Sequence, residues 1–207
     1  MNQEATPTAP AALVLYPTRA DAAPADRETL ARTLADAGLT GSEDAGHPGE
    51  FVAGAGFFQA IAFLGCSPRV ALGADEDPGA RVRIRIRIPD RPRYLPGTPR
   101  PRPRCPACRR AAPAEEALAA WQADPGATWP CPGCGARTPV PGLDWRREAA
   151  FGGAFVEILN VHPHEAVPAD ALLGALEQAT GTPWDFAYRN AGVGAEGPSP
   201  GGEGGEG

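Results

Sequence analysis

Four of the five cysteines form two pairs with the same internal spacing, and this pattern suits a metal ion. Cys105 and Cys108 make the first C-x-x-C pair, Cys131 and Cys134 make the second, and 22 residues separate the pairs. Two residues between cysteines let one tight turn direct both sulfurs at one point. Two such turns complete a tetrahedral shell of four sulfurs, which suits zinc or, less often, iron. We therefore predict one bound Zn²⁺ with these four cysteines as its ligands.

The predicted metal ion has a structural role, because four protein ligands leave no open position for water or substrate. The alternatives are two unconnected thiol pairs or a redox motif, although a redox C-x-x-C normally occurs singly at the start of a helix. An odd cysteine count without a signal-peptide pattern argues against a disulfide framework and predicts a cytoplasmic location. The fifth cysteine, Cys66, has apolar neighbours and is expected to be buried and inert.

The segment around these pairs, about residues 104–140, resembles a zinc ribbon. Cys131-Pro-Gly-Cys134-Gly135 matches the knuckle of that family closely, while Arg109 follows the first pair where glycine is common. We expect Arg109 to make the first turn less regular. The segment between the pairs is also longer than usual, and residues 113–122 are predicted to form a helix there. The resemblance implies a structural zinc ion and, because zinc ribbons often occur in nucleic-acid machinery, adds nucleic acid as an alternative partner.

Arginine is concentrated in one segment of an otherwise acidic chain. All 19 basic residues are arginine, and residues 81–110 carry a net charge of +10 within a chain of net charge −6. Residues 81–88 alternate strictly between arginine and an aliphatic residue, which predicts a strand with one face in the core and an arginine face toward solvent. The arginines of this strand are Arg81, Arg83, Arg85 and Arg87.

Like charges at alternate strand positions repel each other unless negative charge lies opposite them. That charge could come from acidic residues of the chain itself or from a partner. Together with Arg102 and Arg104 of the Pro/Arg-rich segment 89–103, the strand could bind phosphates. A single aromatic residue, Tyr94, lies in this stretch, so no stacking platform is expected. The arginine content also fits codon bias, because alanine, glycine and proline are enriched with it.

Other candidate residues do not form a complete catalytic or metal site. His162, His164 and Glu165 follow a predicted strand and could serve as metal ligands or in acid–base chemistry, but no further ligand has a recognisable spacing. The chain contains no lysine, which excludes the phosphate-binding loop that ends in Gly-Lys. We therefore assign no catalytic residue. The longest apolar runs are too short to cross a membrane.

The elements around the cysteine segment predict an α+β fold. Leu, Ile, Val and Phe number only 35, whereas Gly and Pro total 51, so the core is expected to be modest. Strands are predicted at residues 11–16, 69–72, 81–88, 155–161 and 184–188. Helices are predicted at residues 27–37, 51–64 and 168–179, with a buried strand at 58–64 as the alternative to the second helix. The sheet is expected to include the strands at 69–72, 81–88 and 155–161, and the first two of these are expected to form a hairpin.

These elements predict a small, mainly antiparallel sheet with two or three packed helices and an inserted four-cysteine zinc ribbon. We expect a flexible leader at residues 1–10, one composite domain at 11–189 and a disordered tail at 190–207, because the tail has few apolar side chains. The predicted function is that of a cytoplasmic, zinc-stabilised, non-catalytic binding or adaptor protein for an unknown protein partner. The alternative is a nucleic-acid-binding protein that uses arginines of residues 81–110.

Overall fold

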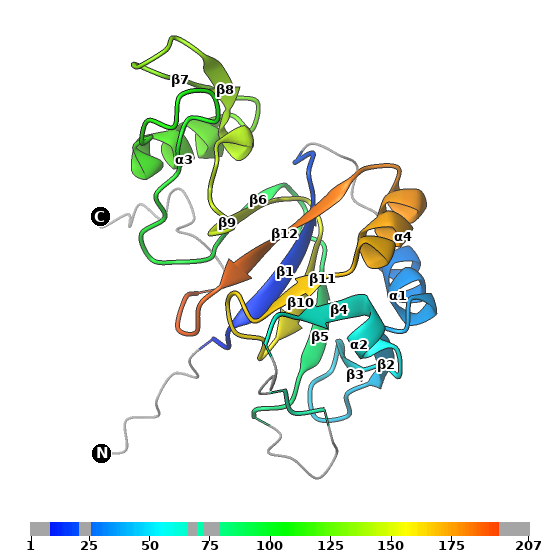
Figure 1. Ribbon diagram of the computed structural model, residues 1–207. Helices are drawn as coiled ribbons and strands as arrows, with labels where there is room; N and C mark the ends of the chain where they lie inside the picture. The colour runs from blue at the N-terminus through cyan, green and yellow to red at the C-terminus, as the bar shows by residue number, and fades with distance from the viewer. Residues whose placement is uncertain (1–8, 21–25, 66–69, 73–78, 195–207) are drawn as a thin grey trace, which may run out of the picture.

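A six-stranded antiparallel β-sheet forms the centre of the protein, with strand order β12-β1-β10-β5-β3-β2. The computed structural model (Figure 1) describes residues 9–20, 26–65, 70–72 and 79–194. The strands of this sheet are β1 (Ala12–Pro17), β2 (Thr40–Glu43), β3 (Glu50–Ala53), β5 (Arg83–Arg87), β10 (Phe155–Leu159) and β12 (Trp184–Arg189). The predicted α+β class with an antiparallel sheet is confirmed.

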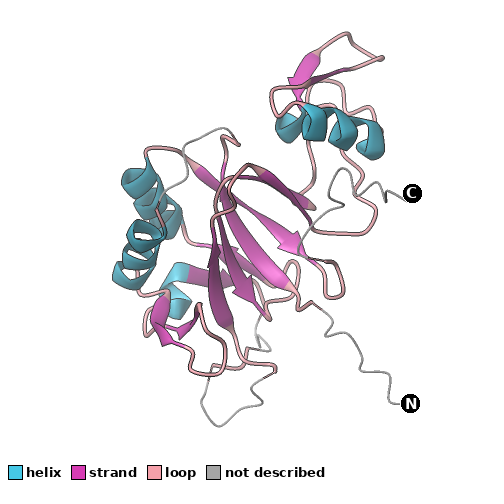
Figure 2. Cartoon of the chain, turned by 180° about the vertical axis from the view of Figure 1, so that it is seen from behind, coloured by secondary structure: helices cyan, strands magenta, loops and turns pink. Residues whose placement is uncertain are grey.

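Two helices cover one face of this sheet, as Figure 2 shows. They are α1 (Arg27–Asp36) and α4 (Asp170–Thr180), both close to their predicted positions. The Asp26 carboxylate accepts a hydrogen bond from the Thr29 N–H at 2.8 Å and so caps the start of α1. Gly181 ends α4 with φ of 68°, a left-handed conformation that glycine adopts without strain. The leucines of both helices pack on the aliphatic positions of the central strands, Ile84 of β5 among them.

The opposite face of the sheet is partly covered by a two-stranded ribbon of β6 (Arg93–Pro96) and β9 (Ala149–Gly152). Leu95 and Ala150 of this ribbon pack against Phe155 and Leu159 of β10. Between β6 and β9 the chain makes an excursion over residues 97–148, which we call the cysteine module (green in Figure 1). The module contains α3 (Ala114–Ala123), β7 (Thr128–Pro130), β8 (Arg137–Pro139) and a 3-10 turn at Val140–Gly142. The helix predicted inside the cysteine segment is therefore confirmed.

The predicted helix at residues 51–64 is wrong. This segment forms β3, the four-residue helix α2 (Phe57–Ala60) and β4 (Ile61–Phe63), which pairs with β11 (Ala166–Pro168). The alternative, a strand in 58–64, is correct for its second half. Close backbone approach explains the difference, because a Cβ at Gly54 would lie 2.4 Å from the Gly38 carbonyl oxygen. The glycines of this segment allow two chain segments to cross, which a regular helix would prevent.

The predicted hairpin between residues 69–72 and 81–88 is also wrong. Ala71 and Arg81 form an isolated parallel bridge, and β5 pairs with β10 on one side and β3 on the other. Residue 69 and the acidic turn at 73–78 lie outside the described residues. The antiparallel partners of β5 thus come from distant parts of the chain.

The predicted leader and tail fall largely outside the described residues, as does Cys66. The first residues of the predicted tail contact the body of the protein. The Asn190 N–H donates to the Gly97 carbonyl at 2.8 Å, the Gly192 N–H donates to the Ala9 carbonyl at 2.9 Å, and Val193 is buried. Among the described residues, no helix has the length and apolar character needed to span a membrane.

Candidate metal centre

The fold brings the four predicted ligand sulfurs into one cluster. All four Sγ atoms lie within 4.8 Å of one another, with 3.8 Å between Cys105 and Cys134 and 3.5 Å between Cys108 and Cys131. A tetrahedral zinc–thiolate centre with Zn–S bonds of about 2.3 Å has sulfurs about 3.8 Å apart. A disulfide would need a separation of about 2.05 Å. The cluster therefore has the dimensions of a metal site.

The two knuckles repeat the same backbone geometry. The Arg109 N–H donates to the Cys105 carbonyl at 2.9 Å, and the Gly135 N–H donates to the Cys131 carbonyl at 2.9 Å. Arg109 has φ of 65° and Gly135 has φ of 75°, so both residues are left-handed. The expectation that Arg109 makes the first turn less regular was wrong. The turn keeps its shape, and the arginine backbone occupies a region that costs a residue with a Cβ about 1–2 kcal/mol.

The elements of the module hold the cluster at the boundary between its core and solvent. Cys105 and Cys131 are buried, whereas Cys108 and Cys134 are exposed. The buried pair packs in a cluster with the rings of Trp121, Trp129 and Trp145 and with aromatic residues of the β6–β9 ribbon. A metal ion at this position would join the loop ends of the module to its aromatic core.

The hydrogen bonds of the second knuckle shift the pKa values of Cys131 and Cys134 in opposite directions. Burial opposes ionisation of Cys131, but the N–H groups of Gly133 and Cys134 lower the pKa of this thiol to about 7. For Cys134, the Ala136 N–H favours the thiolate, yet the neighbouring Cys108 and Cys131 sulfurs raise its pKa. Because adjacent thiolates repel each other, the four cysteines would not all lose their thiol protons unless a bound cation replaced these protons. Sulfur ligands select zinc or iron over magnesium or calcium.

The arginine side chains of β5 do not lie in the predicted position, in which they would face solvent. Arg83 is 7% exposed, and its Nε lies 2.6 Å from Glu50 Oε2. Arg85 also hydrogen-bonds Glu50 and lies 3.3 Å from Glu157. The prediction of a solvent-facing arginine side was therefore wrong for Arg83, which is buried, whereas Arg85 and Arg87 are half-buried, because Glu50 and Glu157 of the neighbouring strands lie on the same face. Of the two proposed sources of negative charge, the chain's own acids are present at the strand.

The centre of this network is Glu157, which no sequence pattern identified as a partner. Glu157 is fully buried and accepts hydrogen bonds from Arg189 at 2.9 Å, Arg85 at 3.3 Å and Arg87 at 3.4 Å. The register explains the contact, because Glu157 lies opposite Arg85 in the β10–β5 pair. A glutamate between apolar neighbours in a predicted strand was the available signal. We call Glu50, Glu157 and the four arginines Arg83, Arg85, Arg87 and Arg189 the buried ion-pair network.

Glu50 makes the stability of this network depend on pH. Burial opposes its ionisation, but hydrogen bonds from Arg85 and Arg83 outweigh this and lower the pKa of Glu50. A lowered pKa means that the ion pair stabilises the fold above the unfolded pKa of about 4.3 and that this stabilisation is lost as pH falls through the folded pKa.

We expect Glu50→Gln to lower the free energy of unfolding by about 2 kcal/mol at neutral pH. Urea unfolding at a series of pH values should show the wild type and the variant converging as the pH is lowered below about 4. A difference between them that persists unchanged at a pH of about 3 would contradict this account.

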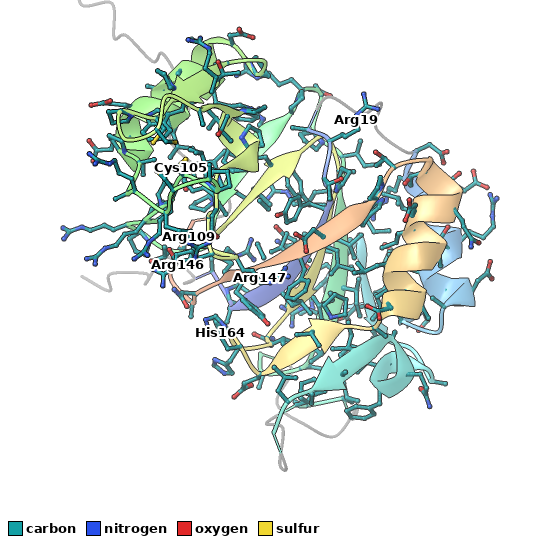
Figure 3. The ribbon with its side chains drawn as sticks, turned by 45° about the horizontal axis from the view of Figure 1, so that its top comes forward. Arg19, Cys105, Arg109, Arg146, Arg147 and His164 are labelled. Atoms are coloured by element: carbon teal, nitrogen blue, oxygen red, sulfur yellow. The ribbon has the colours of Figure 1, made fainter. Side chains whose placement is uncertain are left out.

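The remaining candidate residues do not assemble into a site. His164 lies on the turn after β10 with its ring centroid 4.7 Å from that of Tyr188 (Figure 3). His162, His164 and Glu165 gather no further ligand, since the four cysteines are the one potential metal-binding group found in the described residues. Of the other predicted binding residues, Arg102 is exposed and Arg104 is half-buried at the start of the first knuckle.

The candidate centre thus consists of the four cysteines, two knuckles of matching backbone and a buried aromatic support. Comparison of the chain with protein-family models, with curated proteins and with solved structures gave no match.

Proposed function

We propose that this protein is a zinc-stabilised, non-catalytic binding protein, in which one zinc ion holds the cysteine module in shape. The observation that carries the proposal is the cluster of four sulfurs within 4.8 Å, in which two of the spacings, 3.8 Å and 3.5 Å, are close to those of a tetrahedral zinc centre. All four coordination positions would be filled by Cys105, Cys108, Cys131 and Cys134. The ion would therefore bind no substrate, and its contribution would be to folding.

A partner protein is the first candidate for the binding role. Phe58 and Leu64 are large apolar side chains that remain 57% and 65% exposed. The Phe58 ring lies 5.9 Å from the ring of Phe63, which precedes Leu64, so the exposed residues belong to one region of α2 and β4. Exposed apolar groups of this kind are typical of surfaces that lose water on contact with another protein.

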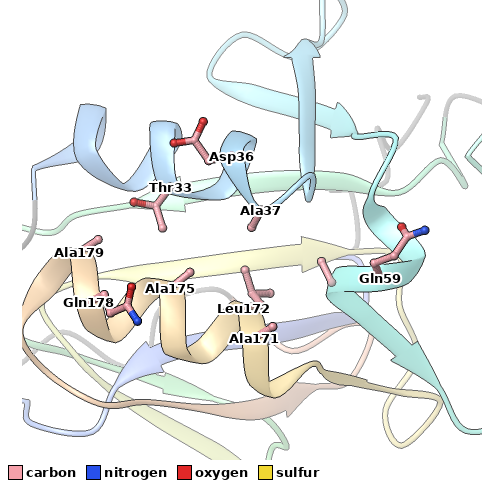
Figure 4. A pocket seen from close by; sticks show the side chains of 10 residues that line it. Thr33, Asp36, Ala37, Gln59, Ala171, Leu172, Ala175, Gln178 and Ala179 are labelled. Carbon is pink, nitrogen blue, oxygen red and sulfur yellow. The ribbon is translucent and has the colours of Figure 1, made fainter.

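A groove next to this region adds to the support for a protein contact. It lies between α1 and α4 and has a volume of about 540 Å³ (Figure 4). Alanines of α4, Ala37 at the end of α1 and Ala60 of α2 line it together with Asp36, Gln59 and Gln178. Gln59 follows Phe58 directly in α2. The groove and the exposed Phe58 together would offer a partner both small apolar contacts and hydrogen-bonding groups.

The test of the proposed function is a metal count on the purified protein. Elemental analysis after gel filtration should give close to one zinc per chain. When a chelator at raised temperature removes the zinc, the near-ultraviolet circular dichroism signal should be lost at the same time. A folded, metal-free protein with a Cys105–Cys108 disulfide would overturn the proposal. If the protein instead contains one iron per chain and shows the absorption of an iron–thiolate centre, the site holds a redox-active metal and not zinc.

A further inference from the structure

We infer that exposed arginines around the four cysteines form a surface that binds the phosphate backbone of a nucleic acid. The surface, which we call the module arginines, consists of Arg109, Arg110, Arg137 and Arg146. All four are exposed, and they flank the two knuckles and the turn that packs beside them. The inference rests on the proposed function, because the knuckles that carry these residues depend on the metal for their shape. It differs from a role for the β5 arginines, which belong to the buried ion-pair network.

Contacts to one shared residue, Asp144, bring two of the module arginines together. Arg109 Nη1 lies 2.8 Å from Asp144 Oδ2, and the Arg146 N–H donates to the other carboxylate oxygen of Asp144 at 3.1 Å. Figure 3 shows Arg109 and Arg146 on the same side of the module as Cys105. The side chain of Arg110 reaches from the first knuckle to the second, since a Cβ on Gly133 would lie 2.3 Å from its Nε.

The charges of this surface are available to an external anion. Within the described part of the chain, Arg110, Arg137 and Arg146 take part in no ion pair, and the Arg109–Asp144 pair is exposed at the arginine. Exposed pairs of this type hold their partners weakly. Ion pairs between described residues therefore engage one of the four module arginines, whereas all four arginines of the buried ion-pair network are paired.

Backbone conformation indicates that arginine is not needed to build these turns. Arg109 has φ of 65° and Arg146 has φ of 56°, a region that favours glycine or asparagine. The second knuckle makes the same turn with Gly135. Arginine is present at both positions despite this unfavourable conformation, and residues in such conformations cluster where function needs their side chains.

Neutralising the thiolate cluster is the competing explanation for these arginines. The observed contacts do not favour it, because in the described residues the cysteine sulfurs hydrogen-bond one another and the backbone N–H groups of Gly133, Cys134 and Ala136. The Arg109 side chain pairs with Asp144, and although Arg110 lies across the second knuckle, no hydrogen bond among the described residues joins it to a sulfur. A fork-shaped guanidinium fits a phosphate through two parallel hydrogen bonds. The module arginines therefore fit an external phosphate better than an internal role.

The surroundings of the surface favour a phosphate backbone over bases or a protein. The tryptophans of the module, Trp121, Trp129 and Trp145, are buried and cannot stack on bases. The large exposed apolar residues Phe58 and Leu64 lie on the body, whereas a protein interface would need such residues near its centre. The expected contact is electrostatic, independent of base sequence and strongly weakened by salt.

The test is binding of a short, fluorescently labelled DNA duplex of mixed sequence, followed by anisotropy at several salt concentrations, with zinc measured in every sample. We expect log K against log salt to fall with a slope of about −3, as three or four phosphate contacts would give. Arg110→Glu combined with Arg137→Glu should lower the affinity by about tenfold or more and reduce the slope by about 2. Arg32→Glu, an exposed arginine on α1, is the matched control and should leave binding unchanged.

Two glycine variants separate binding from structure. Arg109→Gly and Arg146→Gly relieve the left-handed conformation, so they should raise the melting temperature, keep one zinc per chain and still weaken duplex binding. Loss of zinc with unchanged duplex binding would show that the arginines serve the metal and would overturn the inference. Equal loss in Arg32→Glu would also overturn it, as would binding to polyglutamate without binding to DNA, which would indicate an acidic protein partner. A zinc-loaded wild type that binds no duplex overturns this inference alone, whereas a folded preparation without metal overturns the proposed function.

Discussion

Replacing Cys131 by serine should remove the bound metal and unfold the cysteine module. Cys131 is buried, and its sulfur lies 3.5 Å from that of Cys108, so the variant would lose one of the four proposed ligands and keep only three thiols. Metal binding at such sites is folding free energy, on the order of 10 kcal/mol in small finger peptides. Elemental analysis should find far less than one zinc per chain, and the near-ultraviolet circular dichroism of the module tryptophans should collapse.

Ala107→Ser is the matched control for this prediction. Ala107 is exposed in the first knuckle between the two cysteines of the pair, so a hydroxyl there adds no buried polar group. The control should keep its zinc and its circular dichroism. If Cys131→Ser retains a full zinc complement and an unchanged tryptophan signal, the four-sulfur centre is not what stabilises the module.

Glu157→Gln should cause the largest loss of stability among substitutions in the body of the protein. Glu157 is 0% exposed and accepts a hydrogen bond from Arg189, which is 1% exposed. Removing one partner of a buried ion pair leaves an uncompensated charge and costs about 3–5 kcal/mol. Urea unfolding of the zinc-loaded protein should show the free energy of unfolding falling by this amount, seen as a lower midpoint with an unchanged slope.

Glu28→Gln provides a comparison at an exposed ion pair. Glu28 lies 3.0 Å from Arg32 on α1, with side chains 85% and 63% exposed, and such pairs contribute about 0.3–0.5 kcal/mol. A double variant, Glu157→Leu with Arg189→Leu, should recover part of the lost stability because apolar groups replace the buried charges. If Glu157→Gln costs no more than Glu28→Gln, the network does not stabilise the fold.

Local patterns in the sequence predicted the parts of the protein whose geometry depends on neighbouring residues. The C-x-x-C pairs predicted the sulfur cluster because a tight turn needs only two residues between its cysteines, whatever surrounds it. Helices α1 and α4 lie close to the predicted ranges 27–37 and 168–179, and the residues that cap them, Asp26 and Gly181, are likewise local signals. The strict alternation at residues 81–88 correctly predicted a strand with two different faces.

Tertiary structure alone decided what each of those faces contacts. Alternation shows that Arg83 and Arg85 share a face, but not whether that face meets solvent, and Glu50 and Glu157 reach it from strands 35 and 72 residues from Arg85. The same limit applies to residues 51–64, where helical spacing was overridden by the close approach of Gly54 to the Gly38 carbonyl oxygen. Pairing between distant strands is set by the packing of the whole chain, so no short pattern encodes it. The sequence by itself therefore determined that four cysteines can form one cluster and where most local elements lie. The packed fold determined that the β5 arginines are paired internally and that Arg109 and Arg146 lie together beside the cysteine cluster.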